Sequence, residues 1–585
     1  MKKKSAPADA VPPTGSGALA RRVLESGWSR ALLALAAGLM AGLAWPGGPA
    51  PWLWVIVYIP LFVALDALLR GDPRLRPKTW WHGLLLCWLT GVGHGLANGA
   101  WIVNTVHVYG HLPLPLAYGV TLFGYGSLLG LETFAFLGVP FLLGWHRPRW
   151  GFLLVLLWSA AFQGLVPRFL YWTFGHLIHP QPLLVQAADL VGSPGLNFFI
   201  LSLHLAAFAW LRQAYAAPLV GRRQLVGATV AVALLFGAAA GYGWWRERGL
   251  ALATEAGAPV NLGGVQPNFS LGQLASNPEL SFSDRRRGIN ALLGDTARLL
   301  DKFEPSEEIP TVVVWPESVY PVPYFAAPRM REAVEWWARL RRIDLVLASV
   351  AQERVSTPQG MRLRSYGASI HLPAAGGPPN VYRKIALIPF GETIPFASWF
   401  PAYRRVLRGW IPNISEFEPG KEFTVFQVSP DIRLAPMICF DAVSDGVARG
   451  MRRNGANLGL VLANLAWFGK SNGSAMLEYS VRFRAIENRL PILMLSQNGS
   501  SVMIDAAGRA ASARTPEFEP ALLPLRVKVP RTYSFFSAHS GAVQGGYLAG
   551  VGLLLAWRFA RPGTGGRGSR GKSPGNPGRA PARRR

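Results

Sequence analysis

Seven long apolar segments crowd the first 247 residues and constrain the fold more than any other feature. A membrane-spanning helix needs about 20 mostly apolar residues, and these segments are close to that length or longer. They lie near 30–46, 51–69, 80–100, 114–143, 150–166, 184–211 and 225–245, and an eighth lies near 541–560. The fourth and sixth are long enough for a tilted or re-entrant stretch. The pattern predicts a polytopic α-helical membrane domain with about eight spans.

The charges between these segments predict the orientation. The chain has 59 Lys and Arg against 32 Asp and Glu, and basic loops alternate with neutral ones. Basic loops stay on the cytoplasmic side of a membrane. We therefore expect the following order: a cytoplasmic basic leader (1–29), a seven-span domain (30–247), a domain on the outer side (248–540), an eighth span (541–560) and a basic, disordered cytoplasmic tail (561–585).

The basic tail has a second interpretation, which is binding to anionic lipid. A topological anchor is the simpler explanation of its charge. Nucleic-acid binding has less support, because no aromatic residues interleave with the charges and no nucleic-acid-binding fold accompanies them. We expect a membrane as partner and no nucleic acid.

Residues 248–540 have a different pattern, in which short apolar runs alternate with polar segments. Five runs are typical of buried strands, and two longer stretches are typical of helices. The strands are expected at 311–315, 343–350, 432–440, 457–465 and 490–496, and the helices at 283–303 and 473–489. Alternating strands and helices of this kind predict one α/β domain.

Three chemically useful residues lie at the ends of apolar runs in this domain. Glu317 follows VVVWP, Lys384 lies in VYRKIALIPF, and Cys439 ends LAPMIC. Functional sites collect at strand ends in α/β sheets. A cysteine can act as nucleophile, a glutamate as general base and a lysine as the positive charge that stabilises an oxyanion. Taken singly, each has an ordinary structural explanation, namely a core cysteine, a turn and a snorkelling lysine.

The local sequences around these residues carry a family resemblance. The order Glu, Lys, Cys resembles the nitrilase superfamily of carbon–nitrogen hydrolases. The chain is more similar still to the apolipoprotein N-acyltransferase family. The matching stretches are VQPNFS (265–270), VWPES (314–318), YRKIALIPFGETIPF (382–396), ICFD (438–441), NLAWFG (464–469) and RFRAIENRLPILMLSQNGSSVMID (482–505).

The resemblance implies a nitrilase-like α-β-β-α sandwich and a ping-pong acyl transfer in the inner membrane. Cys439 would take an acyl chain from a phospholipid as a thioester and pass it to the α-amine of a diacylated apolipoprotein. Glu317 would move the protons. Lys384 would stabilise the oxyanion together with the backbone N–H of Phe440, and Glu392 would orient the lysine. Neither a cofactor nor a metal is expected.

The resemblance also implies substrate contacts at Asp441, Trp467 and Gln266. The sequence departs from the family pattern close to each of them. Phe440 and Asp441 replace Tyr-Glu, Leu465 replaces an aspartate, and Pro267 follows Gln266 where the family has glycine. These departures leave the triad whole and bear on the choice of acyl donor and acceptor.

Alternative functions remain open at this point. One is a membrane-tethered amidase or other nitrilase-type hydrolase, another is an acyltransferase with a different acceptor, and a third is a non-catalytic transporter or scaffold. Glu132, an ionisable residue within a predicted span, is the feature that hints at transport. His107 and His111, four residues apart, are more typical of interfacial polar residues than of a metal pair.

Overall fold

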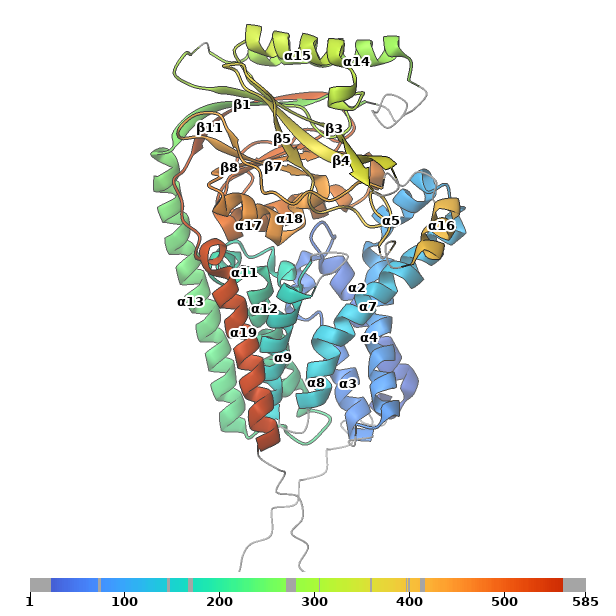
Figure 1. Cartoon of the computed structure of the whole chain (residues 1–585). Coiled ribbons are helices and arrows are strands. Elements are labelled where there is room, and N and C mark those ends of the chain that lie inside the picture. Colours follow the sequence, from blue (N-terminus) through green and yellow to red (C-terminus); the bar gives the residue numbers. More distant parts are fainter. Residues whose placement is uncertain are drawn as a thin grey trace, which may run out of the picture.

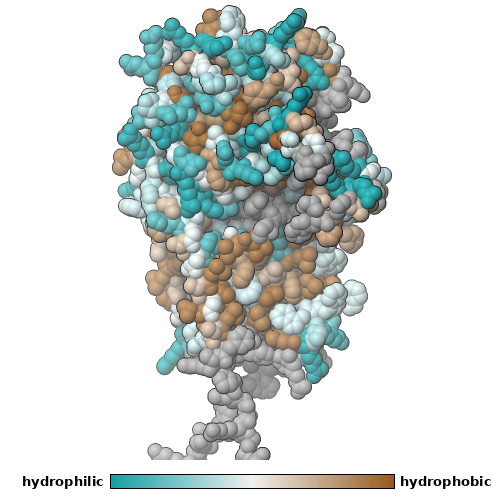
Figure 2. Space-filling model, viewed as in Figure 1, coloured by the Kyte–Doolittle hydropathy of each residue, from teal (hydrophilic) through white to brown (hydrophobic). Residues whose placement is uncertain are grey.

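The chain forms a helical half and a β-sheet half, stacked one above the other (Figure 1). The computed structural model describes residues 23–560, except 72–74, 145–147, 167–171, 270–279, 305, 358–359, 396, 398–399 and 411–415. We call 23–255 with 535–560 the helical half and 256–534 the sheet half. The expected basic tail and most of the expected basic leader lie outside the described residues. In Figure 2 hydrophobic residues gather over the helical half and hydrophilic ones over the sheet half.

All eight predicted apolar segments contain helices. These are α2 (Gly27–Ala44), α3 (Ile59–Gly71), α4 (Pro77–Asn98), α6 to α8 (Leu114–Gly144), α9 (Pro148–Leu165), α10 (Pro182–Val185), α11 (Ala188–Gly195), α12 (Asn197–Arg212), α13 (Arg222–Glu255) and α19 (Phe535–Ala560). Among the described residues, four are long and apolar enough to cross a membrane by themselves: Gly27–Ala44, Pro51–Gly71, Leu114–Gly144 and Arg222–Glu255. The bent pair α11 and α12 makes a fifth if it is one span. The apolar helices expected of a membrane domain are therefore confirmed, and the number of spans stays a prediction.

The predicted sixth span is broken rather than straight. Helices α11 and α12 meet at a bend of 61°. Gly192 has φ +68° and Pro194 follows it inside the helix. A positive φ favours glycine, and proline cannot donate the helical hydrogen bond. The break places backbone and polar side chains of this segment under the sheet half.

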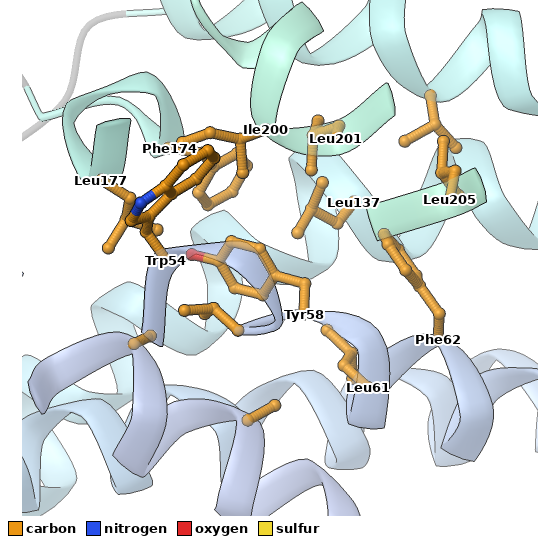
Figure 3. Packing of buried hydrophobic residues seen from close by; sticks show 14 of the residues in the cluster. Trp54, Tyr58, Leu61, Phe62, Leu137, Phe174, Leu177, Ile200, Leu201 and Leu205 are labelled. Carbon is orange, nitrogen blue, oxygen red and sulfur yellow. The ribbon is translucent and has the colours of Figure 1, made fainter. Parts of the chain in front are cut away.

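The core of the helical half is built from large apolar side chains. Figure 3 shows Trp54, Tyr58 and Phe62 facing Phe174 and Leu137 from other helices. Helix α2 approaches α4 very closely at Gly38, where a Cβ would lie 1.9 Å from the carbonyl oxygen of Thr90. Helices in lipid commonly associate through such small residues, because they allow backbone contact.

The sheet half contains two β-sheets. The first has the order β11-β1-β2-β3-β4-β5 and the second the order β10-β9-β8-β7-β6. The strands of the first sheet are β1 (Ala258–Gln266), β2 (Thr311–Val314), β3 (Asp344–Thr357), β4 (Gly360–Leu372), β5 (Asn380–Arg383) and β11 (Ala521–Val529). Those of the second are β6 (Phe426–Gln427), β7 (Arg433–Ile438), β8 (Leu458–Ala463), β9 (Ile492–Ser496) and β10 (Val502–Ile504).

Helices cover both outer faces of this pair of sheets. Helices α14 (Phe282–Leu300) and α15 (Pro328–Leu340) pack on the first sheet, on the side away from the helical half (Figure 1). Helices α17 (Asp445–Arg453) and α18 (Gly473–Asn488) pack on the second sheet, between it and the helical half. Alternate residues of β2 point to opposite faces of the first sheet. Val313 faces α14 and α15, whereas Val312 and Val314 face the second sheet. This is the α-β-β-α sandwich that the family resemblance implies.

Buried ionic contacts join α18 to the kinked segment α11. Asp189 accepts hydrogen bonds from Nε of Arg489 at 2.7 Å and from Nε of Arg246 at 2.8 Å. The carboxylate of Glu487 accepts a bond from the backbone N–H of Ser193 at 2.8 Å. Because Arg489 and Asp189 are almost fully buried, these bonds fix the position of the sheet half on the helical half.

Candidate active site

Three strand ends bring the predicted triad together. Glu317 lies three residues after β2, Lys384 directly after β5 and Cys439 directly after β7. The first two strands belong to one sheet and β7 to the other. The site therefore lies where the two sheets face each other, which neither sheet alone could form.

The lysine connects the acidic groups of the site. Nζ of Lys384 lies 2.7 Å from Oε1 of Glu392 and 3.5 Å from Oε1 of Glu317. The other oxygen of Glu392 accepts the backbone N–H of Ile388 at 2.9 Å. Glu392 thus holds both the ammonium and the loop that follows it, as its expected orienting role requires.

The nucleophile candidate contacts the same carboxylate. The thiol of Cys439 is hydrogen-bonded to Glu317. The backbone N–H of Asn464 donates to Oε2 of Glu317 at 3.0 Å and also to Cys439. One backbone donor, at the end of β8, therefore faces both the acid and the sulfur.

Cys439 has a strained backbone. Its φ is +46°, and it begins a short 3-10 turn, η8 (Cys439–Ala442). A left-handed conformation costs a non-glycine residue about 1–2 kcal/mol. Strain of this kind is kept at functional sites when the surrounding structure holds it. Arg484 provides part of that hold, because its guanidinium donates to the carbonyl oxygen of Val443 at 3.2 Å.

Asp441 braces the turn against the lysine loop. One carboxylate oxygen accepts the N–H of Ala386 at 2.7 Å and that of Ile385 at 3.2 Å. The other accepts the N–H of Ile438 at 3.0 Å and the hydroxyl of Tyr382 at 2.9 Å. The residue has no exposed surface. Asp441 therefore lies behind the reacting groups, tying the segment before Cys439 to the segment after Lys384.

The remaining predicted site residues lie elsewhere around the triad. Gln266 is buried, and its side chain is bonded to the stretch 501–519 rather than to the triad. Phe440 is half-buried and packs on the core between the sheets. Trp467 is 36 % exposed, in the 3-10 turn η9 (Ala466–Phe468), with its ring 4.1 Å from that of Tyr109. Trp467 thus contacts the helical half.

Burial and mutual charge set the protonation of the triad. Burial raises the pKa of Cys439 well above its ordinary value, Glu317 raises it further, and Lys384 opposes both. Burial also raises the pKa of Glu317, while Lys384 lowers it. Burial alone would lower the pKa of Lys384, but Glu392 and Glu317 raise it above the ordinary value. The resting site is therefore a neutral thiol beside a carboxyl group and a permanent ammonium.

Sequence reasoning missed three features of the structure, of which the first two belong to the active site. The only sequence feature that could have pointed to Tyr382 is its position two residues before Lys384. No sequence feature could have pointed to the backbone N–H of Asn464. The third is a cavity inside the helical half, lined by Glu132, His94 and Gln163 among others. It explains why an ionisable residue is tolerated at position 132, because polar side chains share the cavity with it. Among the described residues no cluster of three or more His, Cys, Asp and Glu is arranged to hold a metal ion.

The fold and the site define a membrane protein that carries a carbon–nitrogen hydrolase domain. The carbon–nitrogen hydrolase family model matches residues 310–534, and the model of the apolipoprotein N-acyltransferase N-terminal domain matches residues 37–206. Both matches are similarities to parts of apolipoprotein N-acyltransferases, which the chain resembles in its helical half and in its sheet half.

Similar proteins match over nearly the whole length. The apolipoprotein N-acyltransferase of Geobacter metallireducens is 28% identical, over 91% of this chain and 95% of its own. That of Azotobacter vinelandii is 29% identical, over 92% of this chain and 97% of its own. Among solved structures, an amidase from Nesterenkonia sp. matches at 17% identity and a TM-score of 0.34, covering 50% of this chain and 97% of the amidase.

Proposed function

We propose that this protein is an acyltransferase that moves an acyl chain from a phospholipid to the α-amino group of the N-terminal diacylglyceryl-cysteine of lipoproteins. The observation that carries the proposal is the contact between Cys439, Glu317 and Lys384 in a domain seated on membrane helices. Both substrates carry acyl chains, and a site next to the membrane surface gives them access without leaving the lipid.

In the first step the thiol of Cys439 passes its proton to Glu317 and attacks the ester carbonyl of the phospholipid. Lys384 and the backbone N–H of Phe440 stabilise the oxyanion. The tetrahedral intermediate then breaks its C–O bond to the glycerol. The leaving alkoxide takes the proton from Glu317, and the products are a thioester on Cys439 and a lysophospholipid. The raised pKa of Glu317 suits it to receive and return a proton.

In the second step the neutral α-amine of the acceptor attacks the thioester carbonyl. Glu317 takes the amine proton, and the same two groups stabilise the new oxyanion. The C–S bond breaks, the amide forms, and the thiolate of Cys439 recovers the proton from Glu317. Water in place of the amine would give a fatty acid, so efficient transfer requires that the thioester be kept from water. Lys384, which has no exposed surface, and Cys439, which is 4 % exposed, indicate such a shielded site.

Supporting residues have distinct roles in this scheme. Glu392 orients the ammonium of Lys384, and Asp441 braces the nucleophile turn from behind. For Trp467 we propose contact with substrate, because its ring lies partly exposed beside the helical half. Gln266 shapes the pocket wall indirectly, through its bonds to the 501–519 stretch.

The proposal includes a location in the bacterial inner membrane. Eight spans, periplasmic residues 248–540 and cytoplasmic termini follow from the alternation of basic and neutral loops. The helical character of all eight segments supports this topology. The amidase alternative is not favoured, because the N-terminal domain match concerns the membrane half that simple amidases do not need.

A thioester assay tests the function. Purified protein in detergent is incubated with phospholipid alone, and the mass of the peptide containing Cys439 is measured by mass spectrometry. We expect a gain of one acyl chain, which disappears when a diacylated lipopeptide is added and yields the N-acylated product. Cys439→Ala should give neither adduct nor product, whereas the control Cys87→Ser, within α4, should give both. Product formation by Cys439→Ala would overturn the nucleophile assignment, and fatty acid release without amide would indicate a hydrolase.

A further inference from the structure

The turn η9 is held by the helical half through one backbone carbonyl group. The carbonyl oxygen of Trp467 accepts Nδ2 of Asn104 at 2.9 Å and lies 2.9 Å from the hydroxyl oxygen of Thr105. The final carbonyls of a short helix have no donor within the helix and need one from elsewhere. Here both donors come from another part of the chain, more than 360 residues earlier.

Ring contacts strengthen the same junction. The ring of Phe468 lies 5.3 Å from that of Trp101, and the ring of Trp467 lies 4.1 Å from that of Tyr109. These partners flank Asn104 and Thr105 in sequence. The segment they belong to is α-helical over Ala100–Asn104 (α5) and π-helical over Thr105–Tyr109 (η2). Single π-helical turns occur frequently at functional sites.

The hydroxyl of Thr105 has two possible acceptors. It lies 2.8 Å from the carbonyl oxygen of Trp101 in its own helix and 2.9 Å from that of Trp467. A hydroxyl has one proton and donates to one acceptor at a time. The contact with η9 can therefore be made or released without moving the helix, while Asn104 keeps its bond.

The turn η9 lies directly beside the reacting groups. Asn464 is two residues before it, and the Asn464 side chain accepts the backbone N–H of Ala466 at 3.2 Å. The backbone N–H of Asn464 is the donor that faces both Cys439 and Glu317. A displacement of η9 would therefore shift this donor relative to the thiol.

We propose that Asn104 and Thr105 are positioning residues for the Cys439 site. From the helical half they fix η9, and through η9 they fix the backbone N–H of Asn464. That donor favours the charged forms of the thiol and of the Glu317 carboxyl. The inference concerns the reactivity of the cysteine and rests on the proposed acyl transfer only for one of its two readouts.

Several charged groups act on the same sulfur and set the background for a pH test. Glu317 and Glu392 raise the pKa of Cys439, and Lys384 lowers it. Asp441 faces Lys384 from behind. Because the Asn464 donor lowers the pKa of both Cys439 and Glu317, loosening it should raise both and move thiol reactivity to higher pH.

The experiment compares wild type with the double variant Asn104→Ala/Thr105→Val in detergent. Iodoacetamide alkylates the protein over a range of pH, and mass spectrometry follows the Cys439 peptide. The free energy of two hydrogen bonds between neutral groups corresponds to a factor of about ten in a rate or an equilibrium constant. We expect about tenfold slower alkylation near neutral pH and a rise that begins at higher pH. Thioester formation from phospholipid should slow by a similar factor.

Two control variants separate positioning from general damage. Thr121→Val removes a hydroxyl that donates to its own helix, at Ala117, and should match wild type in both readouts. Thr105→Ser keeps the hydroxyl. In a protein that retains Asn104, this variant should also match wild type in both readouts.

The outcomes divide cleanly. An unchanged alkylation profile in the double variant would overturn the proposal. So would an equal loss at every pH, since that indicates fewer folded molecules rather than an altered site. A shifted alkylation profile in protein that never forms a thioester, wild type included, would support the positioning role and contradict the acyl-transfer function.

Discussion

Tyr382 offers a sharp test of how the site holds its nucleophile turn. Its side chain is fully buried, and its hydroxyl donates to Asp441 at 2.9 Å. Tyr382→Phe removes that single donor and keeps the ring. Asp441 then retains only backbone donors. Because the hydroxyl lowers the pKa of Asp441, its loss must raise that pKa.

The size of the effect follows from the bond. Burial raises the pKa of Asp441 to about 6, against the donors that lower it. A hydrogen bond to a charged group contributes about 1.5–3 kcal/mol. One pKa unit corresponds to about 1.36 kcal/mol, so the pKa should rise by roughly one to two units. Near pH 7 the variant would then carry a largely protonated Asp441, whereas the wild-type group is mostly ionised.

The pH dependence of activity and the pH dependence of stability have opposite signs. A protonated carboxyl group is a weaker acceptor for the N–H of Ile438, so activity should fall as pH drops through the pKa of Asp441, and this loss should occur at higher pH in the variant. The folded-state pKa lies above the ordinary value, so the stabilisation from Asp441 is present at low pH and lost as pH rises through the folded pKa. The variant should therefore be more destabilised relative to wild type at alkaline pH than at acidic pH.

Single-turnover thioester formation, measured from acidic to alkaline pH, checks the activity. We expect the acidic limb of Tyr382→Phe to move up by roughly one to two units. Tyr324→Phe is the matched control, because Tyr324 is equally buried and its hydroxyl donates to Glu335 at 2.9 Å on the opposite face of the sheet. A limb that does not move in Tyr382→Phe, or that moves equally in Tyr324→Phe, would refute the reasoning.

Three further variants test other contacts. Glu392→Gln removes the closest carboxylate from Lys384 and should lower kcat about 10- to 100-fold with little change in KM; a change confined to KM would contradict an orienting role. Gly420→Ala places a Cβ 2.1 Å from the carbonyl oxygen of Arg383 and should cost about 1–3 kcal/mol of stability, seen as a lower thermal midpoint; full stability would mean that the loop yields freely. Asp189→Asn leaves buried Arg489 without its carboxylate and should cost about 3–5 kcal/mol, measured by denaturant titration in detergent, and a neutral result would show that water replaces the lost contact.

Much of the fold was predictable because hydrophobic patterning is a local signal. The predicted strand at 311–315 matches β2 (Thr311–Val314), and the predicted helix at 473–489 matches α18 (Gly473–Asn488). The strand predicted at 343–350 is wrong in length, since β3 runs to Thr357 and pairs with the whole of β4. The second part of that hairpin is polar and exposed, so it carries no apolar pattern to mark it as a strand.

The site was predictable only in part, for the same physical reason. Cys439, Glu317 and Lys384 end apolar runs, and such positions are visible in the sequence. The orientation of Asp441 is not visible, because its partners lie more than 50 residues away in the chain. The family resemblance implied a contact with substrate, and the structure shows the carboxylate accepting hydrogen bonds from backbone N–H groups and from the hydroxyl of Tyr382.

The arrangement explains how the strained backbone of Cys439 is held in place. Asp441 holds the nucleophile turn to the lysine loop. Arg484, which donates to the carbonyl oxygen of Val443 and to the hydroxyl of Ser193, connects the same turn to the helical half. The η9 turn makes a second connection, from Asn464 to Asn104. Because two of these three supports end on the helical half, that half does more than anchor the enzyme: it completes the framework that keeps the sulfur beside its acid and its ammonium.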